Sequence, residues 1–290
     1  MRKKSIYEGL IYLIITSFSV LCIIPLLLVI IVSFSSESSI KKFGYSLFPH
    51  GLSLSAYQMI FSSGASLANS YMISVTITVV GTLLAVTITA MAAFTLSNRQ
   101  VRYRNKLALY FFFTMIFNGG IVPWYIVCSK LGLHNNIFAL IIPSLVFSPF
   151  NMFLVRNFMK GIPDSLMESA KIDGAGDIVI AFRIYFPLCI PVLAAVGLFY
   201  GLAYWNDWWN SIMLVESTNL FPLQYLLFKM QSELQMLRDL KIYSANSGIE
   251  QPTESFKMAT VIITIGPIVF LYPFLQKYFV KGLIIGSVKG

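Results

Sequence analysis

The chain has 290 residues, of which 57% are hydrophobic and 11% charged, with a mean hydropathy of +0.76 and a formal net charge of +9. A soluble domain of this length needs far more polar surface to cover its core, so the composition excludes an ordinary soluble protein. The positive charge does not indicate nucleic-acid binding, because the basic residues cluster in short segments beside apolar stretches, as the positive-inside rule expects.

Six stretches without Asp, Glu, Lys or Arg are long enough for a membrane span, which requires about 20 apolar residues. They predict six transmembrane helices, at residues 8–32, 69–96, 107–127, 138–155, 188–212 and 257–277. The first stretch follows a basic start, as a signal peptide would. It is too long for a signal core and is closed by no small-residue cleavage pattern, so we expect an uncleaved first helix.

The distribution of basic residues predicts the orientation of these spans. With the amino terminus inside, fourteen of the 21 Lys and Arg residues are cytoplasmic and lie close to spans. They are Arg2, Lys3, Lys4, Arg99, Arg102, Arg104, Lys106, Arg156, Lys160, Lys171, Arg183, Lys277, Lys281 and Lys289. Both termini are then cytoplasmic, segments 33–68 and 213–256 are external, and segment 156–187 is a cytoplasmic loop long enough to fold.

The residues that usually carry chemistry show no catalytic or metal-binding pattern. Cys22, Cys128 and Cys189 are an odd number without metal-ligand spacing, so we expect them to be small apolar packing residues. His50 and His134 are isolated in the sequence. There is no Walker-type phosphate loop and no nucleophile elbow, so we predict no catalytic residue and no cofactor bound by this chain.

The cytoplasmic segment 156–187 carries a helix signal. Pro163 and Asp164 are typical of a helix start, with an acidic residue in the first turn. An apolar face is expected from Leu166, Met167, Ala170 and Ile172. Gly174 and Gly176 then interrupt this helix, and a second apolar helix is expected to reach Pro187. Such a unit suits docking of another protein, and a helix lying on the membrane surface is the alternative.

This segment resembles a known family. Permeases of type I ABC importers carry the pattern E-A-A-x3-G-x9-I-x-L-P, and here Glu168-Ser169-Ala170 is followed at the same spacings by Gly174 and by Ile184-Tyr185-Phe186-Pro187. Ser169 replaces Ala and Phe186 replaces Leu, both mild changes of size. Asp173-Gly174-Ala175 also matches the common form of the motif, and the loop lies between the fourth and fifth expected spans, as in the sugar-type members.

Further resemblances cover nearly the whole chain. Ala68-Asn69-Ser70 and Ala93-Phe94-Thr95-Leu96-Ser97 resemble the runs that open and close the second span in this family. Two further runs are similar to those of its carbohydrate-uptake (maltose-type) group: Phe117-Asn118-Gly119-Gly120-Ile121-Val122-Pro123 and Trp205-Asn206-Asp207. Within that group, the chain is most similar to the LplC-type permeases. The resemblance implies an all-α membrane protein with six transmembrane helices, a MetI-like permease core and a cytoplasmic coupling helix.

The resemblance also implies roles for segments and partners. It implies an N-terminal helix and external loop at 1–68, a permease domain at 69–277 and a cytoplasmic tail at 278–290. The coupling residues would be Glu168, Ser169, Ala170, Asp173, Gly174 and Ala175. The expected partners in the bacterial cytoplasmic membrane, besides lipid, are a homologous second permease, two ATPase subunits that use ATP-Mg, and an external sugar-binding protein.

A substrate pathway is expected near the outer ends of the third and fifth spans. Its candidates are Asn118, Trp124, Tyr125, Trp205, Asn206, Asp207 and Trp208. Aromatic faces bind sugar C–H surfaces and side-chain amides bind hydroxyls, whereas anchoring at the membrane interface is the alternative for Trp and Tyr. The external segment 213–256 would meet the binding protein, with a disordered spacer as its alternative.

Other functions remain as alternatives. A type I importer for a peptide or another small solute shares the motif around Glu168, although the runs at 117–123 and 205–207 favour a sugar. An ion-driven secondary transporter predicts buried membrane carboxylates and usually an inverted repeat, and neither is visible in the sequence. A structural or enzymatic membrane protein has no supporting chemistry.

Overall fold

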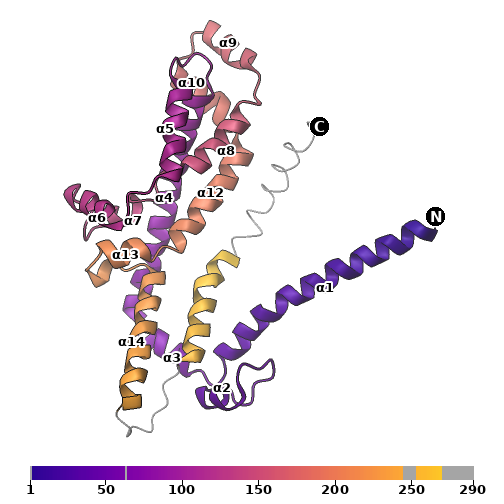
Figure 1. The fold of residues 1–290 in the computed structure, drawn as a ribbon, viewed down its shortest axis with the longest axis vertical. Coiled ribbons are helices and arrows are strands. Elements are labelled where there is room, and N and C mark those ends of the chain that lie inside the picture. Colours follow the sequence, from indigo (N-terminus) through magenta and orange to yellow (C-terminus); the bar gives the residue numbers. More distant parts are fainter. Residues whose placement is uncertain (1, 63, 244–252, 270–290) are drawn as a thin grey trace. The chain divides into compact units, whose positions relative to one another are not determined.

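The computed structural model describes residues 2–62, 64–243 and 253–269, and this part of the chain is helical (Figure 1). The helices are α1 Arg2–Ser33, α2 Glu37–Phe43, α3 Ser55–Ser62, α4 Gly64–Ser97, α5 Arg104–Ile116, α6 Ile121–Lys130, α7 Phe138–Ile141, α8 Pro149–Met159, α9 Asp164–Ile172, α10 Asp177–Ile180, α11 Phe186–Leu188, α12 Ile190–Trp205, α13 Trp209–Leu214 and α14 Leu223–Tyr243. A π-helical turn Ala181–Tyr185, a 3-10 turn Thr218–Leu220 and a helix over 254–269 complete the described structure. The predicted all-α class is confirmed.

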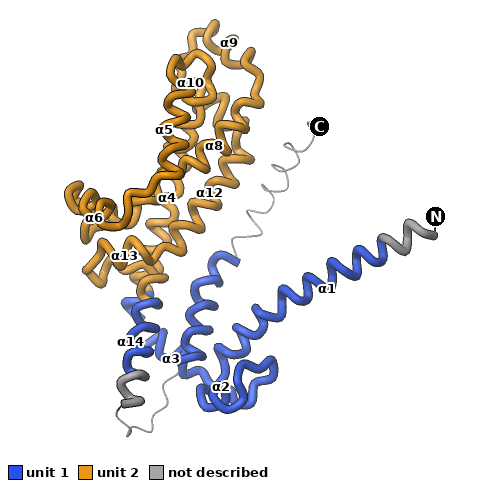
Figure 2. Tube along the Cα trace, viewed as in Figure 1, with its two compact units in different colours: residues 1–67, 227–269 blue, residues 68–226, 270–290 orange. Residues whose placement is uncertain are grey.

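The chain forms two compact units, shown in different colours in Figure 2. The first contains residues 1–67 and 227–269, so it combines the two ends of the described chain. The second has residues 68–226 as its described part and contains most of α4 together with α5 to α13. The motifs recognised in the sequence between Asn69 and Pro187, and the turn after Trp205, all belong to this second unit.

The core of the second unit lies between α4, α8 and α12. Its buried side chains include Ala85 and Phe94 of α4, Met152 of α8 and Tyr204 of α12. Gly81 of α4 lies directly under the Tyr204 ring, and a β-carbon built on Gly81 would come within 2.5 Å of that ring. The two helices therefore approach closely because one of them has no side chain at the crossing, as is common where helices pack in lipid.

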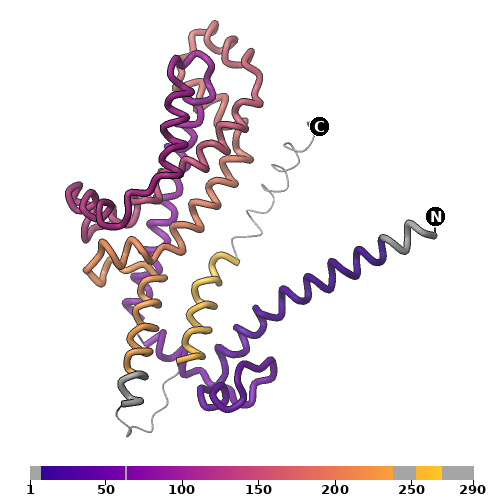
Figure 3. The backbone as a smooth tube through the Cα atoms, in the orientation of Figure 1, coloured from indigo at the N-terminus to yellow at the C-terminus, as the bar shows by residue number. Residues whose placement is uncertain are grey.

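Two helices, within Glu8–Ser33 and Gly64–Ser97, are long and apolar enough to cross a membrane, and they match the first two predicted spans. Two bent helix pairs in the described chain could each supply one more span. The span predicted at 107–127 bends by 117° between α5 and α6, where Gly120 has a φ of 88° (Figure 3). The span predicted at 188–212 is instead α12, which ends at Trp205 and follows an 85° bend from the helix over 177–188. The uninterrupted spans predicted in these two places are therefore wrong.

The span predicted at 138–155 is also interrupted, since α7 ends at Ile141 and α8 begins at Pro149. Pro143 and Pro149 explain the break, because proline disfavours a helical residue before it and has no N–H to donate. Side chains of α12 bind the open segment: the Tyr204 hydroxyl donates to the Ile141 carbonyl at 2.7 Å, and the Ser148 N–H donates to the Tyr200 hydroxyl at 2.8 Å. The break is thus a fixed part of the structure.

Replacing Tyr200 with Phe is expected to destabilise the protein by about 1–3 kcal/mol, because the Ser148 N–H and the Thr89 hydroxyl both lose this partner. The free energy of unfolding in detergent would measure the loss. Tyr110→Phe removes the same hydroxyl from an exposed position and should have almost no effect. Equal stability of the two variants would show that the Tyr200 hydroxyl does not hold the break.

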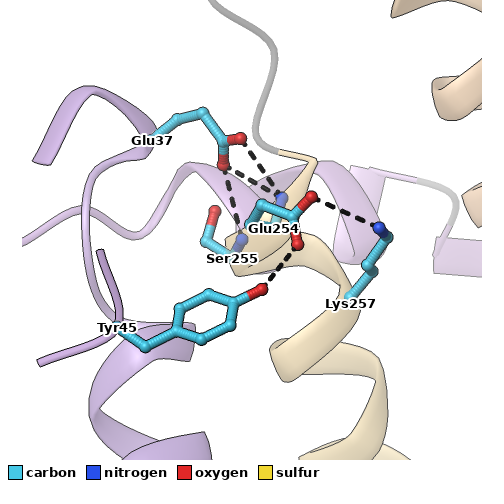
Figure 4. Close-up of polar contacts among 5 residues, drawn as sticks. All are labelled: Glu37, Tyr45, Glu254, Ser255 and Lys257. Atoms are coloured by element: carbon cyan, nitrogen blue, oxygen red, sulfur yellow. Dashed lines mark hydrogen bonds and ion pairs between the residues drawn. The ribbon is translucent and has the colours of Figure 1, made fainter. Parts of the chain in front are cut away.

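The first unit is held by a carboxylate that caps a helix from a distant part of the sequence (Figure 4). Glu37, only 5% exposed, accepts hydrogen bonds from the backbone N–H groups of Glu254 at 3.1 Å and Ser255 at 3.4 Å. Glu254 in turn accepts from the Tyr45 hydroxyl at 2.8 Å and pairs with Lys257 at 3.3 Å. The hydrogen bond to Glu254 and then burial raise the pKa of Tyr45 above its usual 10.0. The N–H groups at a helix start lack helical partners, and Glu37 supplies an acceptor with favourable charge.

Replacing Glu37 with Ala should therefore cost about 1–2 kcal/mol, as loss of a helix cap does. Amide hydrogen exchange at Glu254 and Ser255 should accelerate, which mass spectrometry of peptides from this region would detect. Glu37→Gln keeps the side-chain length and one acceptor oxygen, so its exchange rates should fall between those of the wild type and Glu37→Ala. Unchanged exchange in Glu37→Ala would contradict the capping role.

The cysteines mostly follow the sequence expectation. Cys128 and Cys189 are buried in two apolar clusters of the second unit, and Cys22 is exposed on α1. His134 is not isolated, because its Nε2 atom lies 3.8 Å from a carboxylate oxygen of Glu216.

Candidate functional site

Helix α9 contains the segment singled out in the cytoplasmic loop, and it lies at one end of the second unit (Figure 1). It begins after Pro163 with Asp164 in its first turn, so the predicted helix start is confirmed. Met167 is buried, and Ala170 packs against the core of the unit. Leu166 and Ile172 are 42% and 87% exposed, so two residues of the predicted apolar face pack inward and two face outward.

The end of α9 explains the glycine in the motif. Gly174 has a φ of 80°, its N–H donates to the Lys171 carbonyl at 3.0 Å, and the Ala175 N–H donates to the Ala170 carbonyl at 2.9 Å. This pair of bonds is the Schellman helix end, which places a residue in the left-handed region, where a β-carbon is unfavourable. A β-carbon on Gly174 would meet no other atom within 4 Å, so the requirement for glycine comes from the backbone alone.

The remaining motif residues form an exposed surface. Glu168, Ser169, Asp173 and Gly174 are exposed, and Ala170 and Ala175 support them from beneath. Glu168 and Ile172 are four residues apart, so they share one helix face. A carboxylate beside a large exposed apolar side chain is a combination suited to binding a protein surface. The six predicted coupling residues therefore lie together, with four exposed and two packed inward.

Ion pairs connect α9 to its neighbours in the unit. Arg99, which follows α4, lies 3.3 Å from Asp164 at the start of α9, and Lys171 lies 3.3 Å from Asp177 at the start of α10. Lys171 also donates to Gln100. Such exposed pairs contribute little energy singly, yet together with buried Met167 they fix the direction in which the exposed face points.

Four predicted pathway residues lie in the turn between α12 and α13. Trp205 is buried and its ring lies 6.5 Å from that of Tyr71, whereas Trp208 is exposed and packs edge-on against Trp209. Asn206 accepts a hydrogen bond from the Gln224 amide at 3.2 Å. Tyr71 and Gln224 were missed in the sequence because a single Tyr or Gln at these positions has no distinguishing pattern.

Asp207 has a local structural role, since its carboxylate accepts from the N–H groups of Trp209 at 3.2 Å and Asn210 at 3.3 Å and so caps α13. Its Oδ2 atom and the Oδ1 atom of Asn210 are buried without a hydrogen-bond partner in the described part of the chain. An unpaired buried acceptor is unfavourable, so these two atoms cost stability in this conformation.

The other three pathway candidates lie around α6. The Asn118 side chain accepts from the Gly120 N–H at 2.9 Å and shapes the turn before α6. Trp124 is half-buried in a cluster with Cys128 of α6 and Leu214 of α13, and Tyr125 is exposed. The cluster connects α6 and α13, so Trp124 belongs to the same end of the unit as the turn after Trp205.

Comparison with known proteins identifies the family. Residues 82–285 match the family described as "binding-protein-dependent transport system inner membrane component". The chain is 35% identical to the polygalacturonan/rhamnogalacturonan transport system permease protein YtcP of Bacillus subtilis, over 99% of this chain and 100% of that protein. It is 38% identical to the protein LplC of the same organism, over 92% and 90%.

A solved structure supports the same assignment for the fold. A chain from the crystal structure of a bacterial ABC transporter involved in the import of the acidic polysaccharide alginate superposes with a TM-score of 0.79. That chain is 27% identical, and the match covers 96% of the present chain and 98% of that chain. The chain belongs to the family of inner membrane components of binding-protein-dependent transport systems.

Proposed function

We propose that this chain is a permease subunit of an ATP-binding-cassette importer that carries a sugar or oligosaccharide across the cytoplasmic membrane. The observation that carries the proposal is the exposed face of α9, where Glu168 and Ile172 stand above a core-packed Met167 and a glycine-closed helix end. Relatives named for the transport of polygalacturonan and of arabinooligosaccharides, together with the alginate importer, favour a carbohydrate substrate.

In this proposal α9 is the coupling helix and docks on a separate ATPase subunit. The chain crosses the membrane six times, counting the bent and interrupted helices as single spans, and both termini are cytoplasmic. A homologous second permease completes the pathway, two ATPases bind ATP-Mg, and an external binding protein delivers the substrate. The chain itself holds no cofactor and has no catalytic residue.

Transport then depends on movement of α9. Closure of the two ATPases on ATP displaces the docked helices, and the permease halves exchange between inward-open and outward-open states. A ligand shifts such an equilibrium only by binding one state more tightly than the other. The open and closed forms of the ATPase must therefore bind α9 with different affinities. The ion pairs at Asp164 and Lys171 transmit the displacement from α9 to α4 and α10.

The turn after Trp205 is the proposed polar part of the pathway. Asn206, Asp207 and Trp208, together with Asn118, Trp124 and Tyr125, offer aromatic surface and amide groups to a sugar.

Affinity purification of the full chain from its native membrane in mild detergent tests the proposal. A second six-span permease and a soluble ATPase should co-purify, as identified by mass spectrometry. The external binding protein encoded with them should bind oligosaccharides by calorimetry and should not bind peptides. A chain that purifies alone at full stability, with or without ATP, would refute the importer proposal, and a partner that binds peptides would refute only the carbohydrate part.

A further inference from the structure

A polar cavity lies beneath α9 in the second unit, away from the turn after Trp205. It has a volume of about 330 Å³ and is enclosed by the end of α4, the start of α5, the end of α8 and the start of α9. Its charged lining residues are Arg99, Arg104, Arg156, Lys160 and Asp164. The size falls within the range of small-ligand sites, so its chemistry decides what it holds.

The cavity has an excess of positive charge. Asp164 pairs with Arg99 at 3.3 Å, and within the described residues Arg104, Arg156 and Lys160 have no carboxylate within 4 Å. Arg156 uses its Nε–H to donate to the Leu96 carbonyl at 3.0 Å, which holds the guanidinium in place. The charge of Arg156, then burial and Arg104, lower the pKa of Lys160, as expected for cations crowded together.

The start of α5 adds to this field. Arg104 is the first residue of the 13-residue helix α5, whose N-cap residue Tyr103 makes no side-chain cap. The positive end of a helix dipole and its free N–H groups favour an anion. Arg104, Arg156 and Lys160 line one cavity whose carboxylate, Asp164, is already paired with Arg99, and an anion would stabilise this arrangement.

We infer that this cavity is a binding site for a phosphate-bearing anion, and that the headgroup of an anionic phospholipid is its source. Guanidinium groups bind phosphate oxygens through paired N–H donors. The face of α5 that carries Arg104 also carries apolar side chains and favours a lipid over free phosphate, because Leu107 and Met115, three and eleven residues after Arg104, are exposed. Acyl chains can lie along that surface. Basic pockets between cytoplasmic helix ends are recognised sites for acidic lipids, and the cytoplasmic placement used here rests on the proposed orientation.

The bound lipid would affect α9 directly. Met167 of α9 lines the same cavity, and Asp164 at the start of α9 forms one of its edges. A phosphate group that neutralises Arg104 and Lys160 therefore stabilises the cavity wall that α9 packs against. The site binds a membrane lipid and not the transported solute. It therefore goes beyond the proposed sugar transport and does not depend on it.

Native mass spectrometry of the full chain, purified with whatever partners accompany it, would measure binding of phosphatidylglycerol and of phosphatidylcholine with identical acyl chains. The wild type should bind phosphatidylglycerol more tightly. The double variant Arg104→Gln/Lys160→Gln should lose this preference, roughly fivefold for each basic residue removed. Arg156 is left unchanged because its hydrogen bond to Leu96 supports the fold.

The matched control is Arg102→Gln/Lys106→Gln, which removes the same charge from the same region. Arg102 and Lys106 both lie over the Tyr103 ring and do not line the cavity, so this variant should keep the lipid preference. Equal loss in both double variants, or no loss in the first, would overturn the site. Competition by inorganic phosphate separates the two sources: displacement of the lipid at millimolar phosphate would overturn the lipid source in favour of a free anion.

Discussion

Replacing Gly81 with alanine is expected to destabilise the permease by about 2–3 kcal/mol, the upper part of the range of about 1–3 kcal/mol for inserting a methyl group into a packed core. The new β-carbon would come within 2.5–2.7 Å of the Tyr204 ring. The ring has no room to move, since Tyr204 is 1% exposed and its hydroxyl is fixed on the Ile141 carbonyl. Relief would require α4 and α12 to separate. Thermal unfolding in detergent should show the melting temperature lowered by roughly 5–10 °C.

The control is Gly197→Ala, on the other side of the same helix contact. A β-carbon on Gly197 would lie 3.6 Å from a methyl group of Val86, which is an ordinary contact distance. Alanine is the better helix former, so this variant should equal or exceed the wild type in stability. The two glycine substitutions are thus predicted to act in opposite directions. A fall of the same size in both variants would mean that helix contact at Gly81 is not specifically tight.

If α9 docks on an ATPase as proposed, replacing Glu168 with Lys should abolish ATP-driven uptake while leaving the chain folded. Glu168 is exposed and the first residue of the motif, so reversal of its charge should change stability by less than about 0.5 kcal/mol. Placing a like charge, or an unmatched one, at a protein interface costs several kcal/mol, so affinity for the ATPase should fall by about 100-fold. Titration of the detergent-solubilised chain with its purified ATPase would measure this loss.

The matched control is Glu216→Lys, another exposed carboxylate, at the other end of the second unit, where α13 lies. It should retain full affinity for the ATPase. A further comparison separates shape from charge: Gly174→Ala strains the left-handed end of α9 by about 1–2 kcal/mol without altering any charge. If Glu168→Lys and Glu216→Lys bind the ATPase equally well, α9 is not the docking element.

Local signals in the sequence predicted the bounds of α9 correctly. Pro163 fixes its own φ and starts the helix, and Gly174 ends it in a conformation that other residues avoid. These features act within a few residues, so no tertiary information was needed. The direction in which each face of α9 points is not determined by local sequence. Leu166 and Ile172 belong to the same predicted apolar face, yet the unit offers packing partners only along the line of Met167 and Ala170.

The continuous spans predicted from hydropathy failed for a different reason. An apolar run shows that a segment can lie in lipid, but it does not show where the helix breaks. The opening between Ile141 and Pro149 is stabilised by side chains from α12, about 50–60 residues away in the sequence, and the bend at Gly120 by the nearby Asn118 side chain. Gly and Pro in these runs showed where the helix could break. The hydrogen bonds of the folded chain determine that it does break there.

The candidate pathway shows the same division. The run Trp205-Asn206-Asp207 was visible as a motif, and its position in the turn between α12 and α13 gives Asp207 a capping role that the motif did not reveal. Tyr71 and Gln224 became visible as neighbours only through packing and a hydrogen bond. The sequence thus revealed functional motifs whose residues are adjacent in the chain. It did not reveal the residues that surround these motifs in the fold.

The cap supplied by Glu37 sets an order for assembly during synthesis. Its hydrogen-bond partners lie 217 and 218 residues later in the chain. The described part of the second unit is continuous from 68 to 226, so it can pack while the ribosome is still extending the chain. The first unit must wait for residue 255, and at ordinary translation speed that delay is a few seconds. Until then the Glu37 carboxylate lacks the N–H donors of Glu254 and Ser255. A chain stalled before residue 253 therefore cannot form the hydrogen bonds that hold the first unit together in the finished protein.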